Sequence, residues 1–297
     1  MPTPGPGHRG SRGALAVVAV VALVAALLAG CTRDGSSPAS GPASSGAASP
    51  TASPPTSPTG KMITVPVYYA TDTGTDLKLV REFRALPDVG GPALTAAAAV
   101  LAGEPLDPDY HGLWDPAGKV LWVRPTTGVI EVDLTTAATS TRTGSAGAAL
   151  AVQSLVYAVT GALQSDDPIR ILVEGQPVDE LFGVLDTHAA IPRGDPLSDR
   201  LLVQINNPNE GDVVGRTVTV SGEAAVFEAT LPWHVETSDG TVAQSGVAHT
   251  SEGQTFAPFS FDVTLEPGSY VVVITEDDPS DGAGRPPTSD TRAITVR

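Results

Sequence analysis

The segment GSAGAALAVQSLVYAVTGALQ, residues 144–164, carries the strongest helical pattern in the chain. Its apolar residues recur every three or four positions and form one stripe: Ala148, Val152, Leu155, Val156, Val159 and Leu163. A helix with such a stripe packs this face against a sheet or another helix. The helix is expected to end at Asp166-Asp167-Pro168, because proline cannot continue it and restricts the residue before it.

Strand patterns and one further helix surround this segment. Pro92 suits the first turn of a helix, where a missing N–H costs nothing, and Gly103 suits its C-terminal cap. The resulting ββαββαβ order predicts an α+β domain over residues 62–176, in which a small mixed sheet carries two helices. The predicted strands are 63–69, 77–86, 119–124, 129–134 and 169–174, and the helices are 92–103 and 144–164.

The pattern changes after residue 176. Residues 177–200 contain prolines and aspartates with little periodicity, which is typical of a connector. From residue 201 only strand patterns remain, at 201–205, 217–220, 225–235, 241–248, 256–265, 270–275 and 292–296. Short alternating strands of this number, in about a hundred residues, predict an antiparallel β-sandwich over residues 201–297. With no cysteine in this region, core packing alone is expected to hold its two sheets together.

Residues 1–30 have the features of an export signal. Arg9 and Arg12 precede an uncharged apolar run from residue 14 to Gly30, which ends in Leu28-Ala29-Gly30-Cys31. This ending resembles a bacterial lipobox, which implies cleavage before Cys31 and attachment of diacylglycerol and a fatty acyl chain such as palmitate. The alternative is an uncleaved helix, although seventeen residues lie at the lower limit for spanning a bilayer. We therefore expect a lipoprotein on the extracytoplasmic face of the cell membrane.

Cys31 is the only cysteine, so disulfides, cysteine-based zinc sites and other thiol nucleophiles are excluded. Residues 31–61 hold mostly Ala, Gly, Pro, Ser and Thr, a composition that cannot bury apolar surface and predicts a disordered tether. A fully extended polyproline-like tether, at about 3.1 Å per residue, would reach roughly 90 Å. Its Ser and Thr residues are candidates for O-glycosylation.

The charge balance limits the classes of partner. The chain has a formal net charge of −16, and loss of the signal would remove two of its few basic residues. An acidic surface repels nucleic acid and anionic headgroups, so we expect neither as a ligand and expect contact with the membrane only through the lipid on Cys31.

Few residues are candidates for catalysis or metal binding. Asp107, Asp109 and Asp115 could hide paired acids for glycoside hydrolysis, but aspartates flanked by proline more often serve turns. The acidic loop 276–282 could bind calcium or be an ordinary solvated loop, and it lacks the full EF-hand spacing. The four histidines outside the signal are not spaced as metal ligands: His111, His188, His234 and His249. We predict no catalytic residue, no cofactor and no metal site.

The three tryptophans are candidates for the core or for a binding surface. Trp233 lies in an alternating strand and is expected in the core, and Trp122 is expected to pack under a helix. Trp114 lies in the loop His-Gly-Leu-Trp-Asp-Pro and is the one expected to be exposed, where it could anchor a partner.

Both predicted domains resemble known modules. Residues 62–175 resemble the GerMN domain of sporulation and germination proteins through VYYA at 67–70, the 92–103 helix, GVIEVDL at 128–134 and QSLVYAVT at 153–160. Residues 201–297 resemble the immunoglobulin-like domain associated with bacterial spore germination. The matching residues there are Ile205, Pro208, Gly211, Asp212, Val218, Val220, Gly222, Ala224 and Phe227-Glu228-Ala229.

The resemblance implies a non-enzymatic envelope protein that contributes to assembly, with a fold similar to ring-building modules, and it brings no catalytic residues. Our leading hypothesis is a cell-envelope lipoprotein that presents two interaction domains to envelope protein partners. The alternatives are a lipoprotein that binds peptidoglycan or a solute, and a hydrolase.

Overall fold

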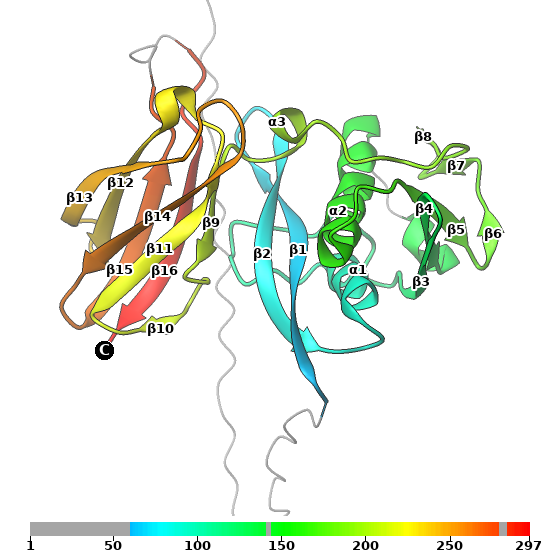
Figure 1. Ribbon diagram of the computed structural model, residues 1–297, viewed down its shortest axis with the longest axis horizontal. Helices are drawn as coiled ribbons and strands as arrows, with labels where there is room; N and C mark the ends of the chain where they lie inside the picture. The colour runs from blue at the N-terminus through cyan, green and yellow to red at the C-terminus, as the bar shows by residue number, and fades with distance from the viewer. Residues whose placement is uncertain (1–59, 141–143, 279–283) are drawn as a thin grey trace, which may run out of the picture. The chain divides into compact units, whose positions relative to one another are not determined.

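The computed structural model describes residues 60–140, 144–278 and 284–297, and residues Thr56–Arg297 form one compact unit (Figure 1). Cys31, the predicted signal and nearly all of the predicted tether lie outside the described residues. The fold class is confirmed: a mixed α+β domain with two long helices precedes an all-β domain with an immunoglobulin-like sandwich.

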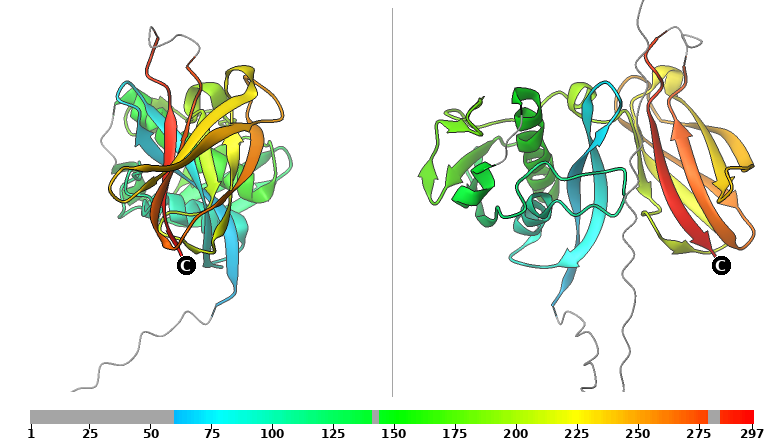
Figure 2. Two further views of the ribbon diagram at one scale, coloured as in Figure 1. Left: turned by 90° about the vertical axis from the view of Figure 1, so that its left-hand side faces the viewer. Right: turned by 180° about the vertical axis from the view of Figure 1, so that it is seen from behind.

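The first domain follows the predicted ββαββαβ order, but its strands form two separate sheets. β1 and β2 pair only with each other as an antiparallel hairpin, while β3, β4, β5 and β6 form a four-stranded sheet in which β4 and β5 run parallel. Figures 1 and 2 show the two helices between the hairpin and this sheet. The elements are β1 (Met62–Asp72), β2 (Leu77–Pro87), α1 (Pro92–Ala102), β3 (Val120–Thr126), β4 (Val129–Leu134), α2 (Ser145–Leu163), β5 (Ile169–Val173) and β6 (Gln176–Pro177).

Strand β1 is buried on both faces, which explains its run of apolar residues. The side chains from Val67 to Ala70 are all buried. The ring of Tyr68 lies 5.3 Å from that of Tyr157 in α2, while the neighbouring Tyr69 lies against α1 in a pocket that includes Ala98. A strand covered on both faces shows a continuous apolar stretch instead of alternation.

Helix α2 is the centre of the first core. By length and composition it could cross a membrane, and it is the only such helix among the residues described. Two thirds of the apolar part of this helix is buried inside the first domain, where Leu155, Val156 and Val159 are fully covered. A core helix passes the same length and composition test as a spanning one.

Residues 177–200, predicted as a connector, carry short elements that pack on the first domain. Leu181 is fully buried in the first core, and Asp195 caps the single-turn helix α3 by accepting a hydrogen bond from the Leu197 N–H. The elements are β7 (Glu180–Leu181), β8 (Leu185–Asp186) and α3 (Pro196–Asp199).

The second domain is a sandwich of a five-stranded sheet, in the order β10-β16-β15-β12-β13, and a three-stranded sheet, in the order β14-β11-β9. The inward residues of both sheets form one apolar cluster that includes Ile205, Val220 and Val272. The strands are β9 (Val203–Asn207), β10 (Val213–Val214), β11 (Thr217–Ala224), β12 (Thr230–Thr237), β13 (Val242–His249), β14 (Ala257–Thr264), β15 (Gly268–Thr275) and β16 (Ser289–Val296).

The predicted strand 225–235 is wrong in its first half. Residues Phe227–Ala229 form a 3-10 turn, in which Glu228 and Ala229 adopt positive φ values of 52° and 56°. This turn breaks the pleat, so Phe227 is 42% exposed although it alternates in sequence with Leu231. The strand begins at Thr230, and the carbonyl groups of Val226 and Ala229 accept hydrogen bonds from the loop after β13.

Candidate functional site: a buried ion cluster joining the two domains

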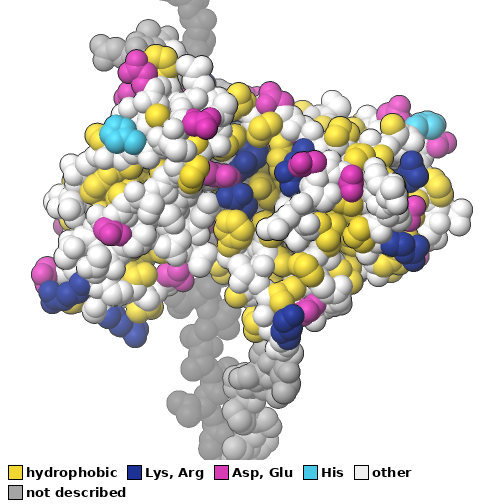
Figure 3. All heavy atoms as spheres, in the orientation of Figure 1, with side chains coloured by type: hydrophobic (Ala, Val, Ile, Leu, Met, Phe, Trp, Pro, Cys, Tyr) yellow, Lys and Arg dark blue, Asp and Glu magenta, His cyan; other side chains and the backbone are white. Residues whose placement is uncertain are grey.

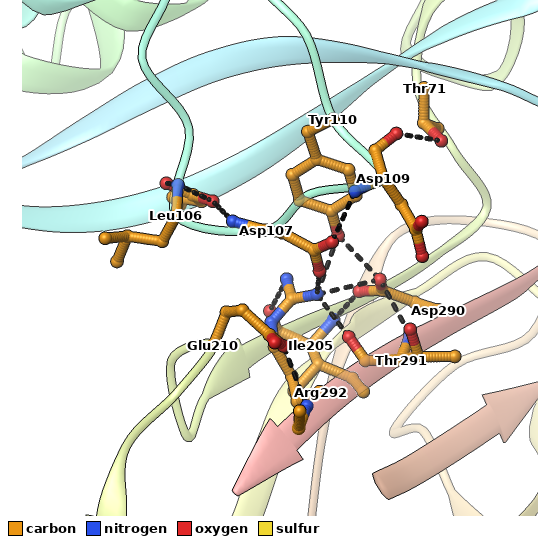
Figure 4. A network of polar contacts seen from close by, with 12 residues as sticks. Thr71, Leu106, Asp107, Asp109, Tyr110, Ile205, Glu210, Asp290, Thr291 and Arg292 are labelled. Carbon is orange, nitrogen blue, oxygen red and sulfur yellow. Dashed lines mark hydrogen bonds and ion pairs between the residues drawn. The ribbon is translucent and has the colours of Figure 1, made fainter. Parts of the chain in front are cut away.

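The loop between α1 and β3 places Asp107 and Tyr110 at the surface of the first domain that faces the second. The Glu82 carboxylate of β2 accepts hydrogen bonds from the N–H groups of Leu106 and Asp107. Asp107 in turn accepts from the Asp109 N–H at 2.9 Å through Oδ1, which leaves Oδ2 to point away from the loop (Figure 4). These contacts lie within the first domain, so they hold the loop in place without any residue of the second domain.

Strands β16 and β9 of the second domain supply the remaining residues. The Nη1 of Arg292 lies 2.7 Å from Asp107 Oδ2, 3.0 Å from Asp290 Oδ1 and 2.8 Å from the Tyr110 hydroxyl oxygen. The Tyr110 hydroxyl donates to Asp290 Oδ1 at 2.6 Å. The Nη2 of Arg292 donates to the Ile205 carbonyl at 2.9 Å, and the Ile205 N–H donates to Asp290 Oδ2 at 2.6 Å (Figure 4).

Within the second domain, this cluster also fastens one sheet to the other. β9 belongs to the three-stranded sheet and β16 to the five-stranded sheet. Both backbone groups of Ile205 are taken by side chains of β16, which thereby imitate the hydrogen bonds of a neighbouring strand. The expectation that core packing alone holds the sheets is therefore wrong: a polar staple assists it where a disulfide is absent.

The electrostatics follow from the composition of the cluster. Asp107 and Arg292 are each 2% exposed, and one guanidinium serves two carboxylates. Burial raises the pKa of Asp107 to about 6. Burial and the charge of Asp290 also raise the pKa of Tyr110 well above its usual range. Burial by itself would lower the pKa of Arg292, but the negative charge of Asp290 and the contact with the Tyr110 hydroxyl oxygen outweigh it and raise that pKa.

A second polar cluster links the domains beside α3. Glu223 of β11 pairs with Arg81 of β2 at 2.9 Å and also with Arg200. The Arg200 guanidinium lies 4.2 Å from the ring centre of Phe256, and burial lowers its pKa. This cluster has the opposite charge balance, with two guanidinium groups and one carboxylate.

Three hollows of the described surface lie outside the Arg292 cluster. The largest, of about 390 Å³, is bordered by Gly211, Tyr270 and residues 293–295. A second, of about 320 Å³, is bordered by the β1–β2 turn, Lys78 and the segment 285–289. A third, of about 200 Å³, is bordered by α1 and β2 and includes Leu86, Val89 and Ala99. None of the three is lined by Asp107, Tyr110, Asp290 or Arg292, so these side chains bind one another and do not face a substrate-sized cavity.

Most of the residues singled out from the sequence do not meet. Asp107 belongs to the cluster, whereas Asp115 accepts from the Ala117 N–H in a turn. His188 pairs with Asp179 and Asp186 at the surface. Among the described residues, no group of three or more His, Cys, Asp or Glu side chains could hold a metal ion. The acidic loop 276–282 lies partly outside the described residues, and Glu276 pairs with Arg285 at 2.8 Å.

The prediction that Trp114 is exposed is wrong. Trp114 is 5% exposed, and its indole N–H donates to the Ala151 carbonyl of α2 at 2.9 Å. The prediction for Trp122 is also wrong, because Trp122 is half-buried under the guanidinium of Arg124, 4.4 Å above its ring, on the face opposite the core residue Val123. Trp233 is half-buried, stacks on Phe261 at 4.6 Å and packs against the second core.

The sequence pattern did not predict that Arg292, Asp290 and Tyr110 would form a site. One signal was present, because Asp290 and Arg292 continue the alternation of Ile294 and Val296 and so lie at core-facing positions of β16. Charged residues at such positions are buried only when they are paired. The partner residues of the first domain carry no comparable mark.

Comparison with known families identifies both domains. Residues 66–179 match the family described as sporulation and spore germination, and residues 202–283 match the immunoglobulin-like domain of bacterial spore germination. The chain therefore carries a GerMN domain followed by an immunoglobulin-like spore-germination domain, as the resemblance predicted. Neither family is described by a catalytic activity.

Three solved structures show similarity at low identity. The tandem GerMN domains of the sporulation protein GerM from Bacillus subtilis are 14% identical, with a TM-score of 0.38 over 49% of this chain and 50% of that one. The first GerMN domain of the same protein is 16% identical, with a TM-score of 0.38 over 45% and 99%. A candidate lipoprotein from Clostridium perfringens is 15% identical, with a TM-score of 0.32 over 50% and 98%. The chain thus spans half the length of the tandem-domain structure. Among curated proteins, none matches the chain.

Proposed function

We propose that this chain is a non-enzymatic cell-envelope lipoprotein that presents its two domains, as one joined body, to protein partners in the envelope. A lipid on Cys31 would hold it at the extracytoplasmic face of the membrane, and the Pro- and Ser-rich segment would act as a tether. The domain families support a role related to sporulation or germination.

The main support for this proposal is that the ionisable side chains with shifted pKa values lie in the contact between the two domains. In enzymes, side chains with shifted pKa values border the cavity that binds the substrate. Here Asp107, Tyr110 and Arg292 contact one another in a buried joint between the two domains. A buried ion cluster that fixes the relative position of two domains is typical of a protein that presents a surface of fixed shape to its partners.

The surface itself fits protein partners better than nucleic acid. On the face seen in Figure 3, hydrophobic side chains gather over the first domain, with acidic and basic side chains scattered among them. The hollow beside α1 brings Leu86, Val89 and Ala99 to this domain's surface, and Val89 is among its exposed apolar residues. Exposed apolar groups with a polar surround are a common feature of protein interaction sites.

The test is cross-linking and affinity capture of the lipidated chain from its own solubilised envelope, followed by mass spectrometry. The wild type is compared with Arg292→Ala, which breaks the joint, and with Arg216→Ala, which removes only the exposed pair with Glu266. The proposal expects partners that are captured by the wild type and by Arg216→Ala and are lost with Arg292→Ala. Recovery of no protein partner by the wild type at any stringency would contradict it.

Binding to peptidoglycan was the alternative, and its argument depended on an exposed Trp114. Because Trp114 is buried and bonded to α2, it offers no surface for stacking on a sugar. Co-sedimentation of the purified chain with peptidoglycan separates the two functions, since strong binding would replace the proposal.

A further inference from the structure

We propose that the joint between the two domains is a proton-controlled latch, which holds most tightly while the Asp107–Asp290 carboxyl pair retains one proton and loosens when that proton leaves. The proposal adds a means of regulation to the joined body described above, and it concerns contacts within the chain alone.

The first support is the number of charges that converge. Arg292 Nη1 contacts Asp107 Oδ2 at 2.7 Å and Asp290 Oδ1 at 3.0 Å. A single guanidinium neutralises one carboxylate, so ionisation of both leaves one surplus negative charge in a place sealed from water. An uncompensated buried charge is costly, and the cost falls when one of the acids binds a proton.

Asp290 accepts more hydrogen bonds than Asp107 does, which is the second support for the proposal. Besides Arg292, Asp290 accepts from the Tyr110 hydroxyl, the Ile205 N–H and its neighbour's backbone N–H on Thr291. Asp107 receives, apart from Arg292, the Asp109 N–H. Hydrogen bonds to a carboxylate favour its charged form, so Asp107 is the member that keeps the proton.

The other charged groups packed around Asp107 come from β2 and from the turn after β9. From β2, Glu82 accepts from the Asp107 N–H and is itself paired with Arg84 at 3.1 Å. From the turn after β9, Glu210 accepts from the Ala293 N–H at 2.7 Å, and its charge disfavours ionisation of Asp107. Thus Asp290 and Glu210 both disfavour ionisation of Asp107, and among the described residues the guanidinium paired with Asp107 is the one that it shares with Asp290.

The direction in which pH changes the closure of the joint follows from the direction of the Asp107 pKa shift. The pKa of Asp107 is raised to about 6 by burial in the closed joint, whereas an open joint would return it toward the ordinary value near 3.8. Closure therefore takes up a proton, and its full strength is present only at acidic pH. The opening equilibrium should rise about tenfold between pH 5 and pH 7.5. The Arg81–Glu223–Arg200 contacts have no surplus of carboxylates, so they keep the domains connected when the latch loosens.

The test is native-state hydrogen exchange of the full chain, with protection of the Arg292 guanidinium N–H groups as the readout because Nη1 contacts Asp107 and Tyr110 across the joint. The wild-type protection factor should fall about tenfold between pH 5 and pH 7.5. Asp107→Asn, which keeps the shape of a neutral acid, should abolish the fall. His188→Gln is the matched control, because the hydrogen bond to Asp186 also raises the pKa of His188, but this side chain is exposed and takes no part in the joint; the variant should behave as the wild type.

A flat wild-type profile, or an equal fall in Asp107→Asn, would overturn the latch. If the asparagine variant does not fold, carbon-detected NMR titration of the wild-type Asp107 carboxyl decides the matter. A midpoint near 6 agrees with the latch, and a midpoint near 4 overturns it. None of these readouts requires a partner, so their failure would leave the capture experiment and the proposed function unaffected.

Discussion

Arg292 holds two domains and two sheets through a single side chain, so its removal has a predictable cost. In Arg292→Ala, the carboxylates of Asp107 and Asp290 remain buried without their counter-ion, and the Ile205 carbonyl loses its donor. Breaking a buried ion pair on one side destabilises a protein by about 3–5 kcal/mol. Urea unfolding at neutral pH should show a loss of this size in the free energy of unfolding.

The control for this prediction is a second arginine in the same domain. Arg216 pairs with Glu266 at 3.0 Å, but both side chains are mostly exposed. Exposed pairs contribute about 0–1 kcal/mol, so Arg216→Ala should unfold almost as the wild type does. Equal losses in the two variants would show that the Arg292 cluster is not a structural joint.

Trp114 permits a second prediction at the level of one side chain. Trp114→Phe keeps an aromatic ring beside Phe182 but removes the indole N–H that donates to the Ala151 carbonyl. The Ala151 carbonyl keeps the Ser154 hydroxyl as a donor, so the loss is that of one net hydrogen bond, about 0.5–1.5 kcal/mol. Thermal or urea unfolding should detect this loss. Unchanged stability together with weaker capture of partners would instead assign Trp114 to a binding surface.

Single residues were the least predictable level from sequence. Asp107 was recognised as a turn residue, and the Asp109 N–H does bond to its side chain. Its ion pair could not be foreseen, because Arg292 lies 185 positions away and approaches only after the domains dock. Trp114 was misjudged because its loop looks polar in sequence, whereas its ring folds back onto α2.

At the level of elements, β9 and β11 pair so closely that one glycine is decisive. A Cβ on Gly222 would lie 1.9 Å from the Gln204 carbonyl oxygen and 2.7 Å from the Phe259 ring. Because neither backbone nor a packed ring can yield easily, Gly222→Ala should destabilise the sandwich by about 1–3 kcal/mol or more. A melting curve measures the effect. Gly215→Ala, where a Cβ meets nothing within 4 Å, should melt close to the wild type.

Elements with one exposed face or a clear cap were predictable. α1 runs from Pro92 to Ala102 with a left-handed Gly103 cap, as its proline and glycine indicated, and α2 begins and ends within one residue of the predicted helix. The failure at Phe227–Ala229 has a physical cause, since alternation of apolar residues does not reveal a turn made by positive φ angles at non-glycine residues. The separation of the hairpin from the other sheet is also set by packing and not by pattern.

For the whole molecule, the first prediction concerns the anchor. Cys31→Ala removes the only thiol that could carry a lipid, so the chain should be released from the membrane. Fractionation of cells followed by immunoblotting measures retention. Retention equal to that of the wild type would indicate that the apolar segment 14–30 stays uncleaved and holds the chain by itself.

The division into two modules could be read from the sequence, but their union could not. Periodicity changes from helical to strand near residue 201, and each module has its own apolar core. The contacts that join them involve charged and polar residues from the α1–β3 loop, β2, β9, β11 and β16. Asp290 and Arg292 stand out as charged residues at core-facing positions of β16, but no periodic pattern indicates which residues of the other module are their partners.

The position of Arg292 in β16 also determines the order in which the molecule can be completed. A polypeptide grows from its N-terminus, so Asp107 and Tyr110 are made about 180 residues before the strand that neutralises them. Until β16 is made, Asp107 and Tyr110 are exposed to water. The Ile205 N–H and carbonyl of β9 likewise lack their partners on β16. Arrival of β16 then closes the sandwich and adds the Arg292 contacts to the joint, so a nascent chain stalled before Asp290 would hold a folded first domain and an open second one.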